Sequence, residues 1–248
     1  MDLNGKIAIV TGAASGFGEA IAHRYAAAGA RVVIVDLNGD KARAVADAIG
    51  EGRAIGVQAD VTARAAIDAA VQATIDTFGV PDIVVNNAGY THKNQPLLDV
   101  DEATFDRVLN VNIKSIYHMV HAVVPAMRDN GGGVILNVGS VAGIRPRPGL
   151  TWYNGSKGAT NMLSKSLAVE LAPWKIRVNV ICPVMGVTGM LEDFMGMPDT
   201  PENRQKFLGS IPLGRFCEPG DVADAAMYLA QSDFITGVEL PVDGGRTI

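Results

Sequence analysis

The stretch Ile7-Ala8-Ile9-Val10-Thr11-Gly12-Ala13-Ala14-Ser15-Gly16-Phe17-Gly18 decides the fold. Its first four residues are apolar throughout, which is typical of a strand buried on both faces. Three glycines follow at once, and an alanine-rich segment near residues 16–28 has helical character. Glycines between a strand and a helix let the backbone turn sharply and bring its N–H groups against a phosphate. The stretch therefore predicts the first strand, phosphate-binding turn and helix of a βαβ unit.

The same alternation of short apolar runs and helical stretches continues along the chain. Further helices are expected near 39–49 and 63–78. The remaining strands are expected at Arg31–Val35, Ala54–Gln58, Asp82–Asn86, Gly133–Val138, Ile176–Ile181 and Val238–Val242. Strand–helix alternation with strands apolar on both faces predicts an α/β fold: a Rossmann-type doubly wound parallel sheet of about seven strands, with helices on both faces. No linker or composition break divides the chain, so residues 1–248 are interpreted as a single domain.

Residues 184–219 differ from the rest because they combine methionines, glycines, prolines and clustered polar residues. Flexible thioethers adapt to irregular apolar surfaces. Met185, Met190, Met195 and Met197, with Phe194, therefore favour a lid that folds over an apolar ligand. A surface insertion without such a role is the alternative.

Composition excludes several classes of protein. The 248 residues carry a net charge of −5 and include 48% hydrophobic residues, which argues against a disordered chain or a nucleic-acid binder. No apolar run is long enough for a membrane span, and Met1 to Lys6 does not resemble a signal peptide, so we expect a cytoplasmic protein. Cys182 and Cys217 are interpreted as ordinary reduced thiols. His118 and His121 have no evident third ligand, so no metal is expected.

Asp36 ends the second predicted strand, 18 residues after Gly18. A carboxylate at this position accepts hydrogen bonds from a ribose diol and repels a 2′-phosphate. No arginine or lysine lies between Gly12 and Gly18 to hold such a phosphate. The expected cofactor is therefore NAD(H) rather than NADP(H). The alternative is that Asp36 only caps a helix or a turn.

Tyr153 and Lys157 are four residues apart at the start of a predicted helix, so their side chains share one face. A phenol is a poor proton donor or acceptor at neutral pH, and a nearby ammonium is expected to lower its pKa. Ser140 ends the preceding strand, 13 residues before Tyr153. Together the three side chains predict general acid/base chemistry on a substrate oxygen.

At these motifs the sequence resembles the short-chain dehydrogenase/reductase family, in its subgroup of about 250 residues, along essentially the whole chain. The matching motifs are Thr11-Gly12-x3-Gly16-x-Gly18, Asp60-Val61, Asn86-Asn87-Ala88-Gly89, Asn112, Ser140, Tyr153-x3-Lys157, and Asn179 followed by Pro183 and Thr188. Val184 departs from the family pattern, which has glycine after the proline, and a side chain there is expected to narrow the substrate pocket.

The resemblance implies a role for each matching residue. Tyr153 would be the general acid/base, Ser140 would hold the substrate oxygen, Lys157 would bind the nicotinamide ribose, and Asn112 would kink its helix and hold a water near Lys157. The implied cofactor-binding residues are Gly12, Ser15, Gly16, Phe17, Gly18, Asp36, Asp60, Val61, Asn86, Ala88, Gly89, Tyr153, Lys157, Pro183 and Thr188. The expected substrate contacts are Ser140, Tyr153, Trp152, Met185 and Met190, within a wall that also draws on Tyr90, His92, Ile144 and Arg145.

The resulting hypothesis is an NAD(H)-dependent oxidoreductase that interconverts a secondary alcohol and a ketone. Candidate substrates are 3-hydroxyacyl or 3-oxoacyl thioesters, polyols and cyclic alcohols, and the resemblance implies a homotetramer built through helices near 112–130 and 153–172. Arg145 and Arg147 suit either an anionic substrate group or a solvated loop. The alternative functions are a catalytically idle NAD-binding protein and an isomerase or dehydratase that uses bound NAD.

Overall fold

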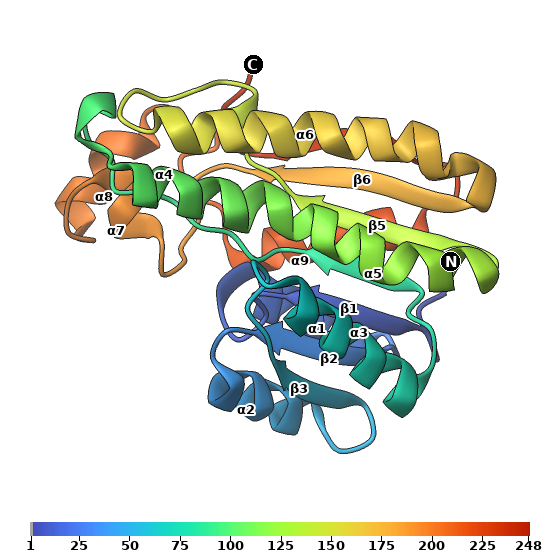
Figure 1. Ribbon diagram of the computed structural model, residues 1–248. Coiled ribbons are helices and arrows are strands. Elements are labelled where there is room, and N and C mark those ends of the chain that lie inside the picture. Colours follow the sequence, from blue (N-terminus) through green and yellow to red (C-terminus); the bar gives the residue numbers. More distant parts are fainter. Residues whose placement is uncertain (1) are drawn as a thin grey trace.

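The computed structural model describes residues 2–248, and its centre is one sheet of seven parallel strands (Figure 1). The strand order is β3-β2-β1-β4-β5-β6-β7. The strands are β1 Ile7–Thr11, β2 Arg31–Asp36, β3 Ala54–Gln58, β4 Ile83–Asn86, β5 Gly133–Val138, β6 Ile176–Pro183 and β7 Glu239–Val242. The predicted fold class is confirmed, and strand bounds differ from the expected ones by at most two residues.

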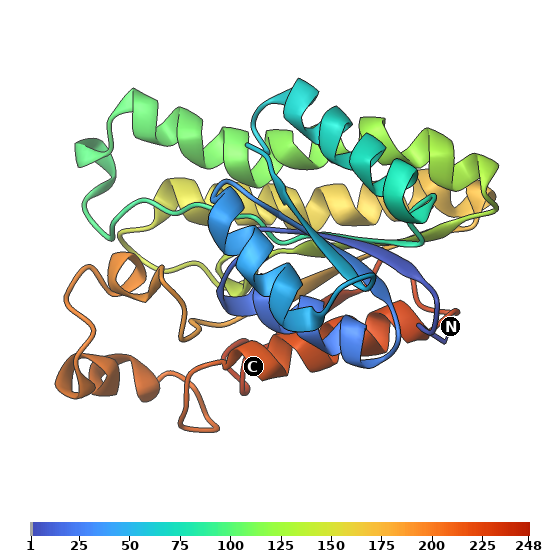
Figure 2. The same cartoon turned by 90° about the horizontal axis from the view of Figure 1, so that it is seen from below.

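Helices cover both faces of the sheet (Figure 2). One core cluster joins the sheet to α1, α2 and α9, and a second joins it to α3, α5 and α6. The helices are α1 Gly16–Ala27, α2 Gly39–Ile49, α3 Arg64–Phe78, α4 Glu102–Leu109, α5 Ser115–Asp129, α6 Thr151–Leu171, α7 Leu191–Met195, α8 Pro201–Leu208 and α9 Pro219–Gln231. Among residues 2–248, none of these helices has the length and apolar character that a membrane crossing requires.

The strand sequences explain this three-layer arrangement. Successive side chains of a strand point to opposite faces of the sheet. In β1, Ala8 and Val10 belong to the core on the α1 side, whereas Ile9 belongs to the core on the α3 side. β2 behaves in the same way, with Ile34 on one side and Val35 on the other. Neighbouring positions of these two strands must therefore both be apolar, as Ala8-Ile9-Val10 and Val32-Val33-Ile34-Val35 are.

Helices α4 and α5 form one continuous rod, joined by a π-helical turn at Asn110–Lys114 (Figure 1). A π turn closes its hydrogen bonds over five residues rather than four, and it marks functional sites frequently. The expected kink at Asn112 thus takes the form of a widened turn within an otherwise regular rod.

The strand order changes direction between β1 and β4, and chain crossovers leave a crevice at such a point. Residues 184–219, which include α7 and α8, lie beyond the carboxyl end of β6 (orange in Figure 1). Within this segment, a parallel bridge between Gly186 and Cys217 joins its first residues to those just before α9.

Candidate active site

A cavity of about 370 Å³ opens at the carboxyl ends of the strands. It is lined by the glycine-rich turn, by the ends of β2, β4, β5 and β6, and by residues of the 184–219 segment. The lining includes most of the predicted site residues: Gly12, Ser15, Gly16, Phe17, Asp36, Asp60, Val61, Ala88, Gly89, Ser140, Tyr153, Lys157, Pro183, Met185, Thr188 and Met190. Gly18, Asn86, Asn112 and Trp152 are not part of the lining.

The glycine-rich turn is packed so closely that side chains are excluded from it. Gly12 has a φ of 61°, and a Cβ on it would lie 2.8 Å from the Ala88 Cα atom. A Cβ on Gly18 would lie 2.5 Å from Asn87 Nδ2 and closer still to the Gly12 carbonyl oxygen. Gly18 therefore serves the turn by making room within it, while the unpaired first-turn N–H groups of α1 remain available to an anion.

Asn87 holds the turn against the end of β4. Its amide nitrogen donates to the carbonyl oxygens of Thr11 and Gly12, at 2.8 and 2.9 Å. The Thr11 hydroxyl oxygen accepts from the backbone N–H groups of Asn87 and Ala88, both at 3.1 Å. Asn87 lines the cavity, whereas the resemblance implies a cofactor-binding role for its neighbour Asn86.

Asn86 points away from the cavity. Its side-chain amide donates to Asn137 Oδ1 on the neighbouring strand β5 at 2.8 Å, and Asn137 in turn donates to the Ser164 hydroxyl. The side chain of Asn86, which the resemblance implies to be cofactor-binding, therefore faces the neighbouring strand and does not line the cavity.

Asp36 lies at the end of β2 with its carboxylate on the cavity. One oxygen accepts from the backbone N–H of Ala14 in the glycine-rich turn at 3.1 Å, and the other accepts from the N–H of Asn38 at 2.9 Å. The glycine-rich turn and the residues after β2 thus hold the Asp36 carboxylate in one position. Asp36 therefore both stabilises the turn after β2, which is the alternative considered from the sequence, and lines the cavity.

Tyr153 and Lys157 project from the first turns of α6 and are almost completely buried. Burial raises the pKa of Tyr153 above its usual range, although a hydrogen bond with the Ser140 side chain acts in the opposite direction. Burial also lowers the pKa of Lys157 to about 8. The Lys157 ammonium donates to the Val138 carbonyl oxygen at 2.8 Å and lies 5.8 Å from the centre of the Tyr153 ring. Burial therefore dominates the pKa of Tyr153, and the lowering expected from Lys157 is not found.

Ser140 lies where β5 ends, directly before a short 3₁₀ turn at Val141–Gly143. Its hydroxyl oxygen accepts from the Ala142 N–H at 3.0 Å, and its side chain is near enough to Tyr153 to act on the pKa of the phenol. Two hydroxyl groups from different elements thereby meet at one point of the cavity wall. Such a pair can hold a single substrate oxygen.

Asn112 lies in the π turn and is fully committed to protein partners. Its side chain exchanges two hydrogen bonds of 2.9 Å with the main chain of Tyr90, and its amide also donates to the Ser156 hydroxyl. If Gly89 carried a Cβ atom, that atom would lie 3.6 Å from the Asn112 side-chain oxygen and 3.6 Å from the Lys157 ammonium. Asn112 thus fixes the loop after β4 next to Lys157, from behind the cavity wall.

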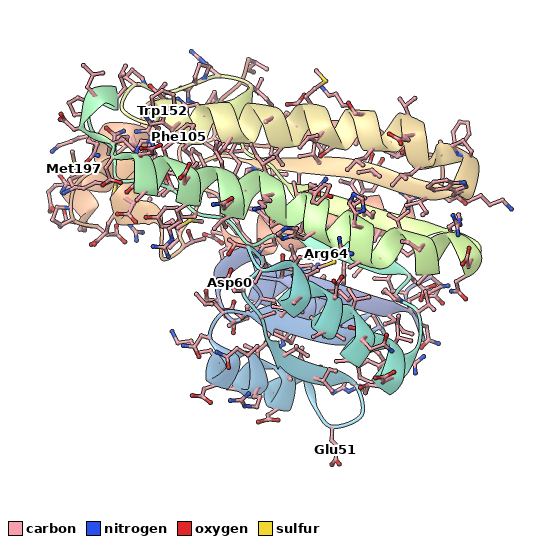
Figure 3. All side chains as sticks on the ribbon, in the orientation of Figure 1. Glu51, Asp60, Arg64, Phe105, Trp152 and Met197 are labelled. Carbon is pink, nitrogen blue, oxygen red and sulfur yellow. The ribbon has the colours of Figure 1, made fainter. Side chains whose placement is uncertain are left out.

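Trp152 lies away from the cavity, next to Phe105 of α4 (Figure 3). The two rings meet edge to face with their centres 5.2 Å apart, and the indole N–H donates to the Leu97 carbonyl oxygen. The residue after Trp152 in a helix points about 100° around the axis from it. Because Tyr153 faces the cavity, Trp152 faces α4 instead of the expected substrate.

The methionines of residues 184–219 divide into two groups. Met185 and Met190 line the cavity together with Phe194, whose ring lies 5.1 Å from that of Tyr153. Met195 is buried in the core on the α1 side, and Met197 packs against the same core. Val184, which replaces the glycine of the family pattern, also reaches the cavity wall. The segment therefore covers the cavity with one face and anchors itself with the other.

Comparison with known proteins agrees with this geometry. The family model described as enoyl-(acyl carrier protein) reductase matches residues 12–247, which is nearly the whole chain. The chain belongs to the short-chain dehydrogenase/reductase family. As a member of this family, it is an oxidoreductase that acts on CH–OH groups and the corresponding carbonyl compounds.

Individual members of the short-chain dehydrogenase/reductase family align along the full length. The chain is 52% identical to a 4-formylbenzenesulfonate dehydrogenase of Comamonas testosteroni, with 100% of both chains covered. It is 38% identical to a 7alpha-hydroxysteroid dehydrogenase of Escherichia coli K12, covering 98% of this chain and 94% of the relative. The structure of a 3-ketoacyl-(acyl-carrier-protein) reductase from Brucella melitensis, complexed with NADH, superposes with a TM-score of 0.94 at 47% identity, covering 99% of this chain and 100% of the other.

Proposed function

We propose that this protein is an NAD(H)-dependent dehydrogenase that interconverts a secondary alcohol and a ketone, with Tyr153 as the general acid/base. The observation that supports it is that Tyr153 and Ser140 lie on the wall of the same cavity as the glycine-rich turn, with the Ser140 side chain near enough to act on the pKa of Tyr153. One cavity thus offers a phosphate cradle and a proton-transfer pair.

The cavity suits a dinucleotide in several respects. A side chain at Gly12 or Gly18 would clash with the neighbouring backbone, so glycine keeps the turn compact at these positions. The N-terminus of α1 offers N–H groups to a pyrophosphate. The Asp36 carboxylate is placed for a ribose diol, and its charge opposes a 2′-phosphate. Ser15, Phe17, Asp60, Val61, Ala88, Gly89, Pro183 and Thr188 would complete the binding surface. NAD(H) would supply the hydride donor or acceptor, and the Brucella melitensis relative was solved with NADH.

The proton would move through the side chains of this chain. In ketone reduction the Tyr153 hydroxyl gives its proton to the carbonyl oxygen, while Ser140 donates a hydrogen bond to the same oxygen. The tyrosinate that forms is buried and costly, since burial raises the pKa of Tyr153. Lys157, with a pKa of about 8, is protonated at neutral pH and supplies a compensating positive charge within the same buried region. Asn112 acts as a positioning residue for this group.

Met185 and Met190 are proposed to contact the substrate, and residues 184–219 to act as a lid. The support is that these side chains and Phe194 form an apolar part of the wall next to Tyr153. Such a wall suits a cyclic or aromatic alcohol better than a polyol. The relatives' names contain an aromatic aldehyde, a hydroxysteroid and a 3-ketoacyl group.

The Tyr153→Phe substitution tests the proposal. It removes one hydroxyl and leaves the ring packing against Phe194 in place, so turnover should fall by at least about 10³-fold, as expected when the acid/base is lost. Binding of NADH, followed by fluorescence titration, should stay within about twofold of the wild type. Tyr228→Phe, at an exposed position on α9, is the matched control.

Retained turnover in Tyr153→Phe contradicts the role of Tyr153. Saturable NADH binding by the wild type, without turnover across thioester, polyol and cyclic alcohol panels, favours a catalytically idle binding protein. NAD that stays bound through purification favours the isomerase or dehydratase alternative.

We also propose a homotetramer that uses the outer faces of α5 and α6. Both helices carry exposed apolar side chains, among them Tyr117, Met162 and Val169. Unpartnered apolar faces of this kind are typical of subunit interfaces. Light scattering would test the mass. A cytoplasmic location is proposed as well, because Cys182 and Cys217 are both free.

A further inference from the structure

Four arginines line the cavity. Arg107 lies over the Tyr90 ring, and the other three, Arg145, Arg147 and Arg246, are close to one another in charge or in hydrogen bonding. Within residues 2–248, none of these three forms an ion pair with an Asp or Glu side chain. Arg145 donates instead to the main-chain oxygens of Arg246 and Ile248, which ties it to the end of the chain. Asp243 is the acidic group whose charge acts on the pKa of Arg246. Its carboxylate oxygens accept hydrogen bonds from Gly245 and Thr247 instead of from the guanidinium.

Arg147 is the most enclosed of these arginines, and its surroundings are apolar. Its guanidinium lies 4.8 Å from the centre of the Phe207 ring on α8, and Nη1 lies 3.8 Å from the Met185 sulfur. Burial lowers the pKa of Arg147, and the positive charge of Arg246 lowers it further. A cation that is partly removed from water and faces a second cation is costly unless an anion joins it.

The position of Arg147 relies on the catalytic helix. Its carbonyl oxygen accepts from the side-chain amide of Asn154 at 2.8 Å, and Asn154 directly follows Tyr153. Met185, which the guanidinium contacts, follows the end of β6 by two residues. Arg147 therefore lies between the helix that carries the acid/base and the segment that covers the cavity.

The charges that line the cavity are separated along it. Its two carboxylates, Asp36 and Asp60, both lie at the end formed by β2 and β3. Arg147 and Arg246 lie on the opposite side, with the 184–219 segment. A molecule that spans the cavity thus meets acidic groups at one end and unpaired cations at the other.

We propose that Arg147, with Arg246 beside it, binds a carboxylate or sulfonate group of the substrate. The inference rests on the proposed function, since it assumes that the reacting oxygen lies at Tyr153 and Ser140. It names the substrate class as small apolar ketones and alcohols that carry one anionic group. A planar guanidinium offers two parallel N–H groups, and these suit both anions.

The experiment compares two ketones of similar shape, 4-acetylbenzenesulfonate and the neutral 4-methylacetophenone. Each is titrated by calorimetry into enzyme saturated with NAD⁺, in which no reduction can occur because NAD⁺ carries no hydride to give. The wild type should bind the sulfonate at least about tenfold more tightly, since a charge-assisted hydrogen bond contributes that much or more. Initial rates with NADH should show the same preference in kcat/KM.

The variant Arg147→Gln should lose at least about tenfold in affinity for the sulfonate and less than about threefold for the neutral ketone. Arg147→Lys keeps the charge but not the planar fork, so it should recover part of the loss. Lys206→Gln removes one positive charge from exposed α8 outside the cavity lining and is the control for the general field. Arg246→Gln serves as a second variant, with a smaller loss, if Arg147→Gln does not fold.

Equal affinity of the wild type for both ketones, including no binding of either, overturns the inference. So does a parallel loss of both ketones in Arg147→Gln, or a tenfold loss of NADH affinity, which would assign Arg147 to a cofactor phosphate. Failure of the proposed function has a different signature: NADH does not bind, or Tyr153→Phe remains active.

Discussion

Substituting Gly18 by alanine tests whether the packing of the glycine-rich turn, rather than its flexibility, is what cofactor binding requires. The new Cβ would lie 2.5 Å from Asn87 Nδ2 and 2.8 Å from the Ala13 Cα atom, and closer still to the Gly12 carbonyl oxygen. Two of these three atoms belong to the backbone, so the turn or the helix has to move. Overpacking of this kind costs about 1–3 kcal/mol.

Gly155→Ala is a matched control for that substitution. Gly155 also lies within a helix, α6, but a Cβ there meets no atom within 4 Å. Replacing a helical glycine by alanine stabilises a helix by about 0.5–1 kcal/mol, and this gain is common to both variants. The difference between the two variants therefore isolates the steric cost in α1, about 1–3 kcal/mol in the free energy of unfolding.

The assay is equilibrium unfolding in urea followed by circular dichroism, together with fluorescence titration of NADH. Gly18→Ala should be less stable than Gly155→Ala by that difference. It should also bind NADH at least about tenfold more weakly, because moving the turn by a few tenths of an ångström misplaces the N–H groups that meet the phosphate. Equal stability of the two variants, with NADH affinity unchanged in Gly18→Ala, would refute the reasoning.

Two further predictions concern charged groups of the cavity. Asp36→Asn should lower the preference for NAD⁺ over NADP⁺ in kcat/KM by about tenfold or more, since it removes a like charge facing the 2′-phosphate, whereas Asp47→Asn, at an exposed position of α2 outside the cavity lining, should leave the preference unchanged. Burial lowers the pKa of Lys157 from 10.5 to about 8, so between these pH values the unfolded chain holds a proton that the folded chain has released. The free energy of unfolding of the cofactor-free protein should therefore rise relative to that of Lys157→Met as the pH increases through this window, and parallel stability curves for the two proteins would contradict it.

The sheet and the shared face of Tyr153 and Lys157 could be predicted from the sequence because both depend on local spacing. Strands that are apolar at every position need helices on both faces, and β1 shows this directly in Ala8 and Ile9. Tyr153 and Lys157 share a helix face through their four-residue separation, and the structure places both on the cavity.

Asn86 and Trp152 do not line the cavity, although each is a direct neighbour of a residue that does. Asn86 and Asn87 have the same side chain, but Asn86 ends β4 and meets Asn137, whereas Asn87 lies just after the strand and reaches the glycine-rich turn. Trp152 precedes Tyr153, but the helical twist turns it toward Phe105. The spacing of residues along the chain shows which side chains share a face of a helix or strand. It does not show which distant segment, such as α4 or β5, packs against that face.

The π turn at Asn110–Lys114 makes the length of the α4–α5 rod a constraint on how this chain can evolve. A π turn carries one residue more than an α turn, and each residue of a helix advances about 100° around the axis. The wider turn absorbs this extra residue, so deleting one residue here should restore a plain α-helix without rotating α5. Met119, Val123 and Met127 would then stay in the core that they fill. What the deletion would remove is the turn from which Asn112 holds the main chain of Tyr90 beside Lys157. The need to hold that loop, rather than the packing of the core, should therefore keep the residue count of the rod constant.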